Sequence, residues 1–242
     1  MSVLDASAVL AIPCGIDYAS VVVGVLTGAM FGCRSKLDVV GTTVSGFLTG
    51  FGGGIVRDLL LGASNIYFMS HPGLILVSLA ICLLTFYFRG VFLDLNRSIL
   101  VADTLSVALF ALAGSSKAFA YGLDPIYVVI LGTITAVGGG ALRDAMAGVT
   151  PGIFRGSNFY AVACLGGSVA FAAMAHFGLP LSAAGFGCVG AVLALRYLSI
   201  RFDWKTREYC DLTPRVVAAA KGASSSSYQH DCSDALKNGR ED

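Results

Sequence analysis

One charged motif occurs twice in this chain, each time inside a long apolar segment. Three glycines, two apolar residues and an Arg-Asp pair occupy 52–58, and the same pattern returns at 138–144. A charge within the hydrocarbon of a bilayer is costly unless it faces protein or water, and such charges mark ion or substrate pathways. The motif therefore indicates a path for ions or small solutes. Its residues are Gly52, Gly53, Gly54, Arg57 and Asp58 in the first copy and Gly138, Gly139, Gly140, Arg143 and Asp144 in the second.

The glycine triplets predict a helix that is broken within the membrane. Glycine weakens a helix by about 1 kcal/mol relative to alanine. Released carbonyl oxygens can replace the hydration shell of a cation, and released amides favour an anion or a carboxylate. The alternative is close helix packing, as in GxxxG motifs, and Gly46 and Gly50 fit that alternative. For the triplets we expect a functional break, because an Arg-Asp pair follows each one.

The charged residues of the motif need partners. Neighbouring helical residues point about 100° apart, so we expect Arg57 and Asp58 not to pair with each other. The duplication instead predicts that Arg57 meets Asp144 and that Arg143 meets Asp58. Such pairs would serve either as a buried lock that fixes the fold or as the lining of a pathway, and both roles can coexist.

Five further polar residues are candidates for the same path. Asp17 and Asp103 begin the first and fourth apolar segments, where they either stabilise a helix dipole or form a pore mouth or coupling site. Lys117 lies near the end of the fourth segment, where it either snorkels to the interface or enters a polar cavity. Thr49 and Thr135 stand one turn before the triplets, where their hydroxyls either line the path or bond to their own helix.

Composition indicates a membrane protein. Of 242 residues 56% are apolar and 13% charged, and the charged share is about half that of a typical soluble protein. A helix needs roughly 20 residues to cross a bilayer, and strand-like alternation is absent, which argues against a barrel. Seven segments qualify or nearly qualify: Ile16–Cys33, Val39–Leu61, Gly73–Phe88, Ile99–Phe119, Ile126–Ala147, Phe159–Phe177 and Leu181–Ser199.

The two halves of the chain are repeats. The glycine triplets begin 86 positions apart, and at this offset about fifteen of the 46 positions from Asp17 to Gly62 are identical. Each repeat holds three segments, and an odd number reverses the second repeat in the membrane. The predicted fold is an all-α membrane protein with seven transmembrane helices, an inverted 3+3 repeat plus a seventh helix. Its parts are an N-terminal segment (1–15), the first repeat (16–98), the second repeat (99–180), the seventh helix (181–201) and a cytoplasmic, largely disordered tail (202–242).

Charge and residue types narrow the class of protein. Basic residues follow the first, third, fifth and seventh segments, which predicts an external N-terminus and a cytoplasmic C-terminus. The net charge of +1 gives no nucleic-acid surface. The seven cysteines and three histidines are scattered, so we expect no fixed metal site and no cofactor. The sequence contains no nucleophile–base set, which predicts that the protein is not an enzyme.

With both GGGxxRD motifs and the seventh segment, the chain from about Asp17 to Arg201 resembles the prokaryotic branch of the trimeric intracellular cation (TRIC) channel family. Each half is similar to the glycine-transporter domain. The resemblance implies a homotrimer with a pore in each subunit, lined by the second and fifth helices, which are kinked at Gly52–Gly54 and Gly138–Gly140. The Lys-Glu-Val signature of the animal members is absent, so their phosphoinositide and calcium-store roles do not carry over.

Two functions fit this pattern. The first is a channel for monovalent cations, with potassium as the expected ion. The second is a secondary transporter of a small amino acid such as glycine, since inverted repeats with interrupted helices suit both. The expected partners are other copies of the chain, membrane lipid and the permeating ion or amino acid. The expected location is the plasma (inner) membrane if the chain is prokaryotic.

Overall fold

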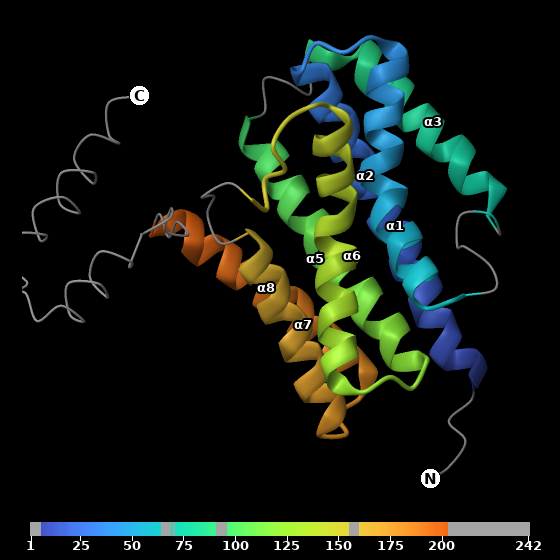
Figure 1. Cartoon of the computed structure of the whole chain (residues 1–242), viewed down its shortest axis with the longest axis vertical. Helices are drawn as coiled ribbons and strands as arrows, with labels where there is room; N and C mark the ends of the chain where they lie inside the picture. The colour runs from blue at the N-terminus through green and yellow to red at the C-terminus, as the bar shows by residue number, and fades with distance from the viewer. Residues whose placement is uncertain (1–5, 64–68, 70, 91–95, 155–159, 203–242) are drawn as a thin grey trace, which may run out of the picture. The chain divides into compact units, whose positions relative to one another are not determined.

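The computed structural model of the chain describes residues 6–63, 69, 71–90, 96–154 and 160–202, and within these ranges it consists of helices joined by turns (Figure 1). The predicted tail beyond Phe202 lies outside the described residues. Each of the seven predicted segments is a helix, which confirms the all-α membrane fold. The helices are α1 (Ala6–Arg34), α2 (Val39–Leu60), α3 (Pro72–Tyr87), α5 (Asn96–Ala120), α6 (Pro125–Met146), α7 (Tyr160–His176) and α8 (Leu181–Arg201).

Helix lengths follow the repeat. Five helices are long and apolar enough to cross a membrane, namely those in α1, α2, α5, α6 and α8. The third helix of each repeat is shorter, with 16 residues in α3 and 17 in α7. At 1.5 Å per residue these two fall short of a hydrocarbon core of about 30 Å. Helix α1 begins at Ala6, ten residues before the predicted start.

The helix ends show why the sequence folds this way locally. Asp38 caps α2, and its carboxylate accepts a 2.7 Å hydrogen bond from the backbone N–H three residues later. Pro72 and Pro125 are the first residues of α3 and α6, where a missing N–H does no harm. Gly62 and Gly148 follow the ends of α2 and α6 with φ values of 60° and 70°. This left-handed conformation suits glycine, so the equivalent helices of the two repeats end in the same way.

Contacts between charged residues show that the repeats run in opposite directions. Asp17, in the first half of α1, meets Arg57 near the end of α2. Lys117, near the end of α5, meets Asp58, which follows Arg57. The end of α5 therefore lies beside the early part of α1, so these two equivalent helices are antiparallel (Figure 1). This arrangement confirms the inverted repeat.

The prediction that the glycine triplets break their helices is wrong. Helices α2 and α6 run through the triplets without interruption and cross each other there. A Cβ atom at Gly53 would overlap the carbonyl oxygen of Thr135, and one at Gly139 would overlap that of Thr49. Close backbone contact between membrane helices offsets the weak helix propensity of glycine, so packing explains the middle glycine of each triplet.

The other glycines of the triplets differ in their surroundings. A Cβ at Gly52 would lie 3.0 Å from the Leu142 side chain, and one at Gly138 would lie 3.5 Å from the Cα of the facing glycine. At Gly54 and Gly140 a Cβ would meet nothing closer than 3.9 Å. At both of these positions the nearest atoms include Nη2 of the arginine three residues later. The third glycine of each triplet therefore leaves space beside a guanidinium group.

The glycine contacts predict a difference between neighbouring substitutions. Gly53→Ala should destabilise the protein by about 1–3 kcal/mol, because its methyl group must displace the backbone of α6. Gly54→Ala has room for the methyl group and should instead raise helix stability by up to about 1 kcal/mol. Thermal unfolding of the detergent-solubilised protein measures both, and equal effects of the two substitutions would contradict the close crossing.

Candidate functional site

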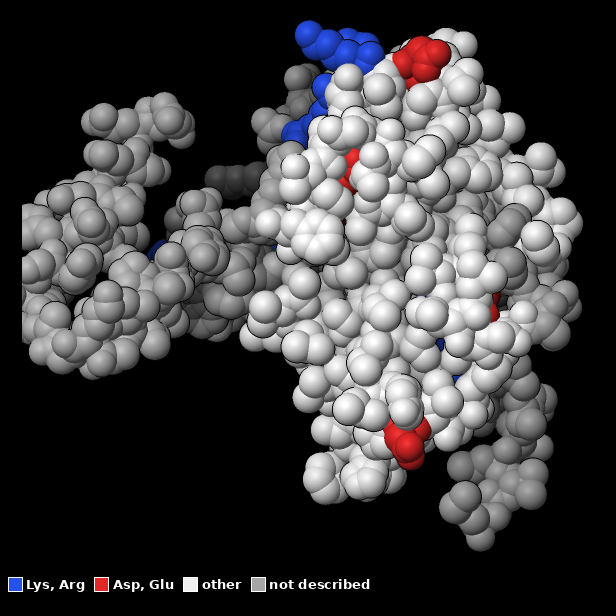
Figure 2. Space-filling view, viewed as in Figure 1, with Lys and Arg blue, Asp and Glu red and all other residues white. Residues whose placement is uncertain are grey.

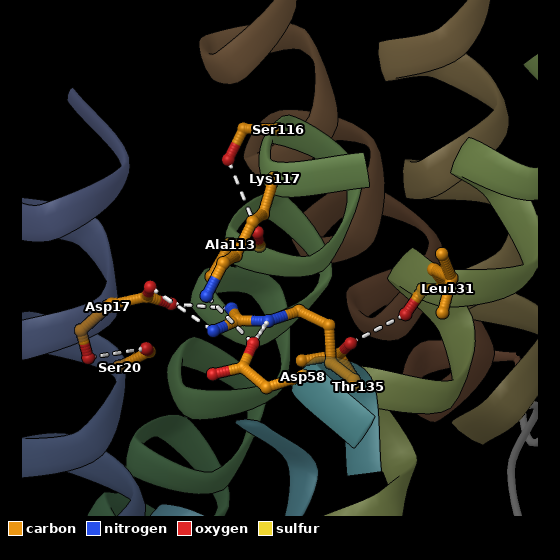
Figure 3. A network of polar contacts seen from close by, with 9 residues as sticks. Asp17, Ser20, Asp58, Ala113, Ser116, Lys117, Leu131 and Thr135 are labelled. Atoms are coloured by element: carbon orange, nitrogen blue, oxygen red, sulfur yellow. Dashed lines mark hydrogen bonds and ion pairs between the residues drawn. The ribbon is translucent and has the colours of Figure 1, made fainter. Parts of the chain in front are cut away.

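Four charged side chains meet where α1, α2 and α5 approach one another, and we call them the first charge site: Asp17, Arg57, Asp58 and Lys117. Arg57 donates from Nη1 to Asp17 Oδ1 at 2.6 Å and from Nη2 to Asp17 Oδ2 at 3.3 Å. Its Nε donates to Asp58 Oδ1 at 2.8 Å. Lys117 Nζ reaches the same oxygen at 2.8 Å. Figure 3 labels Asp17, Asp58 and Lys117, which converge from three helices.

The first charge site is neutral and nearly closed to solvent. Two cations face two anions, and the Arg57 and Asp58 side chains are 1% and 0% exposed. Lys117 is the most accessible member, with 17% of its side chain exposed. Charges this deeply buried are tolerated only when they are paired and hydrogen-bonded, so the site joins α1, α2 and α5 at one end of the spans.

The predicted pairing of Arg57 with Asp144 and of Arg143 with Asp58 is wrong. In both repeats the arginine Nε bonds to the aspartate that follows it, at 2.8 Å for Arg57 and 2.9 Å for Arg143. The expectation that neighbours could not pair considered only where the Cα–Cβ bonds point. The arginine side chain is long enough to fold back along the helix. Each Arg-Asp bond therefore forms between two residues of the same repeat.

A second charge site, made by Asp103, Arg143 and Asp144, lies at the opposite end of the spans. Arg143 donates from Nε and Nη2 to Asp144 Oδ1, at 2.9 and 2.7 Å. The other oxygen, Asp144 Oδ2, accepts a 3.1 Å bond from the Gly152 N–H. The Phe31 ring covers the guanidinium, with its centroid 4.1 Å from Cζ, a cation–π distance.

Asp103 is placed differently from its counterpart Asp17. It is half-buried, and within the described part of the chain it makes no hydrogen bond and no ion pair. The Arg143 and Asp144 side chains are 14% and 11% exposed. The second charge site is therefore more open than the first, and it contains a carboxylate that no arginine or lysine among the described residues neutralises by direct contact.

Sequence reasoning missed three residues that lie around the second charge site. Phe31 lies 86 positions before Lys117, so an alignment of the two repeats pairs these residues and could have identified Phe31. The Tyr160 hydroxyl and Arg143 Nη2 each lie 3.9 Å from the Cβ position of Gly140. Arg196 of α8 is half-buried, and its Cζ lies 4.8 Å from the centroid of the Tyr160 ring.

The two candidate threonines lie at the crossing of α2 and α6. Thr49 and Thr135 are buried, and their hydroxyls donate to backbone carbonyls of their own helices at 2.8 and 2.6 Å. They also pack on equivalent glycines, Gly28 and Gly114. The structure brings them beside the triplets and between the two charge sites. Their role in lining a path, like that of the triplets and the charged residues, stays a prediction.

The two charge sites predict unequal consequences for one substitution made in both repeats. Asp17→Asn should destabilise the fold by about 3–5 kcal/mol, because it removes one of the two anionic partners of the buried Arg57 and leaves Asp58 shared between Arg57 and Lys117. Asp103→Asn should cost less than about 1 kcal/mol, because Asp103 has no direct ionic partner among the described residues. Thermal unfolding in detergent measures the difference, and a cost for Asp103→Asn as large as that for Asp17→Asn would contradict these assignments.

Comparisons with known proteins find that the chain is similar to membrane proteins that occur in bacteria. The family model described as "Glycine transporter" matches residues 15–90 and 100–176, one match for each repeat. A UPF0126 membrane protein of Deinococcus radiodurans is 33% identical over 187 residues, which are 77% of this chain and 86% of that protein. The UPF0126 inner membrane protein YadS of Escherichia coli K12 is 31% identical over 192 residues, or 78% of this chain and 92% of that protein.

Solved structures with the same fold are ion channels. The TRIC orthologue of Rhodobacter sphaeroides has a TM-score of 0.74 and 31% identity, over 79% of this chain and 98% of that one. A second structure, described as the basis for conductance through TRIC cation channels, has a TM-score of 0.75 and 30% identity, over 81% of this chain and 96% of that one.

These relatives are membrane proteins and channels, in agreement with the prediction that the chain is not an enzyme. The matches span both repeats, both charge sites and most of the length of each relative. The chain belongs to the UPF0126 (glycine transporter) family of multi-pass membrane proteins and shares its fold with the prokaryotic TRIC channels.

Proposed function

We propose that the protein is a channel for monovalent cations, with potassium as the main ion and a pore within each protomer beside α2 and α6. The observation that carries the proposal is the placement of one charge site at each end of these two helices, within membrane-spanning segments. Ionisable residues at such depth are rare unless they serve an ion or substrate pathway. The relatives of known structure that match this chain over most of their length are described as cation channels.

The pairing of the charges favours a monovalent ion. Both carboxylates of the first charge site are neutralised by arginine or lysine, and Asp144 is neutralised by Arg143. A passing ion therefore meets few uncompensated carboxylates along these helices. Tight divalent sites collect six or more oxygen ligands, often from several carboxylates, whereas conduction requires binding weak enough for the ion to leave.

The first charge site provides a gate in this proposal. Lys117 shares Asp58 Oδ1 with Arg57 and is the most exposed member of the group. In this proposal the ammonium group of Lys117 occupies and closes this end of the path. Withdrawal of the ammonium group would leave Asp58 bound to Arg57 and would open space for a hydrated ion without breaking the pair of Arg57 with Asp17.

Assembly and orientation are further parts of the proposal. The Rhodobacter sphaeroides relative is described as trimeric, and we infer a homotrimer here, which native mass spectrometry would count. Basic side chains gather at the end of the molecule where α1 joins α2 (Figures 1 and 2). Arg34 ends α1, Lys36 lies in the turn after it, and Arg89 follows α3. We infer that this end is cytoplasmic. Reporter fusions to the C-terminus test this orientation.

Transport of a small amino acid is the second candidate. The family model is described as a glycine transporter. The second charge site favours it in one respect, because Arg143 and Asp103 carry opposite charges but do not pair with each other. A zwitterion presents a carboxylate and an ammonium group that match such a pair.

Purified protein in planar bilayers under a potassium chloride gradient separates the two functions. The channel proposal predicts discrete current steps whose reversal potential lies close to the potassium equilibrium potential. Absence of such steps, together with saturable uptake of glycine into proteoliposomes, would overturn the channel proposal and support the transporter.

The gate can be tested by changing the charge of one residue. Lys117→Met keeps a long side chain but cannot bind Asp58, so the open probability should rise several-fold. Lys117→Arg keeps the cation and should leave the open probability close to that of the wild type. Single-channel recordings measure both, and a Lys117→Met protein that opens no more often than the Lys117→Arg protein would contradict the gating role.

A further inference from the structure

The two charge sites contain the same Asp, Arg and Asp at equivalent positions, yet the residues pair differently. Arg57 gives Nη1 and Nη2 to Asp17 and Nε to Asp58. Arg143 gives Nε and Nη2 to Asp144, the equivalent of Asp58. The bond to the aspartate of the first helix of each repeat is therefore made in the first site but not in the second.

We propose that a permeating cation binds at Asp103, and that Phe31 and Asp144 together keep Arg143 from neutralising this carboxylate. The proposal rests on the channel function proposed above. It assigns different tasks to the two sites, with the first acting as an ion-paired closure and the second as the place where the cation binds during passage.

A lysine-to-phenylalanine difference between the repeats accounts for the change in pairing. Lys117 binds Asp58, so in the first site that carboxylate is shared between the lysine and Arg57. The equivalent position in the second site is Phe31, which has no charge to offer Asp144. Asp144 is then free to take both Nε and Nη2 of Arg143, and the Phe31 ring lies 4.1 Å from the guanidinium carbon.

The contacts of Asp144 hold this arrangement in place. One carboxylate oxygen binds Arg143 twice, and the other accepts the Gly152 N–H at 3.1 Å. A guanidinium bound on its edge by a carboxylate and on its face by an aromatic ring has two independent contacts that resist reorientation. Arg143 is therefore fixed toward Asp144 rather than toward Asp103.

Asp103 is left as a carboxylate suited to transient binding. A cation at Asp17 would have to displace a two-point arginine contact, whereas a cation at Asp103 displaces no direct partner among the described residues. Arg143 and Arg196 act on Asp103 only at longer range, which weakens cation binding without abolishing it. The space left by Gly140 adjoins this site, and the Tyr160 hydroxyl borders that space.

Single-channel recording of Asp103→Asn tests the proposal. At low potassium chloride the conductance should fall roughly two- to five-fold, and the loss should shrink at high salt as screening and saturation remove the advantage of a fixed charge. The potassium-to-chloride permeability ratio should fall as well. Asp38→Asn is the matched control, because Asp38 is an exposed carboxylate at the same end of the molecule and asparagine also caps helices well.

A second variant tests the part assigned to Phe31. In Phe31→Lys the new ammonium group should bind Asp144, as Lys117 binds Asp58. Arg143 should then be able to bind Asp103. Conductance at low salt should then fall as in Asp103→Asn, and the two substitutions combined should lower it no further than either alone. Phe31→Leu removes the ring without adding a charge, so it should lower conductance less than Phe31→Lys.

The outcomes separate this inference from the channel function. If the wild type conducts potassium and Asp103→Asn conducts equally well at low salt with an unchanged permeability ratio, the cation site is refuted and the channel stands. Additive losses in the combined variant would refute the role of Phe31. A wild-type protein without channel currents would refute both the channel and the cation site. Size-exclusion profiles and thermal unfolding of each variant establish that it is folded.

Discussion

The cost of burying an ionised side chain in a membrane is the constraint on which this structure depends. Each repeat places an arginine and an aspartate near the end of a spanning helix, and each arginine is held by carboxylates rather than left to lipid. Removing one partner from such a group is far more costly than the net stability the intact group provides. The positions of α1, α2 and α5 around the first charge site are therefore tied to one another through Arg57, which binds Asp17 of α1, and Asp58, which binds Lys117 of α5.

Inverted duplication supplies the two ends of the path with related but different chemistry. The inverted repeat gives each end of the path an Asp, an Arg and a second Asp at equivalent positions. The residue contributed by the opposite repeat then decides how they pair, because Lys117 brings a positive charge to one end and Phe31 brings an aromatic ring to the other. Between the ends, Gly53 and Gly139 allow α2 and α6 to cross at backbone contact.

Much of this fold follows from the sequence, since apolar length and the 86-residue offset define the seven helices and the inversion. The charge partners could not be predicted in the same way. The proximity of Arg57 to Asp17 depends on the packing of α1 against α2, and the bond from each arginine to the next residue depends on a rotamer. The predicted break at the glycine triplets is wrong because a run of glycines is compatible both with a broken helix and with a continuous helix against which another backbone packs closely. Asp103 and Asp17 occupy equivalent positions in the two repeats, and only the structure distinguishes their partners.

Two equivalent carboxylates differ in the proposed channel, because Arg57 binds Asp17 whereas Asp103 would bind the permeating ion. Anomalous scattering from crystals of the wild-type protein soaked in thallium, a heavy substitute for potassium, locates monovalent cations directly. The account predicts a thallium peak beside the Asp103 carboxylate and none beside Asp17. A peak at Asp17 with none at Asp103 would contradict it.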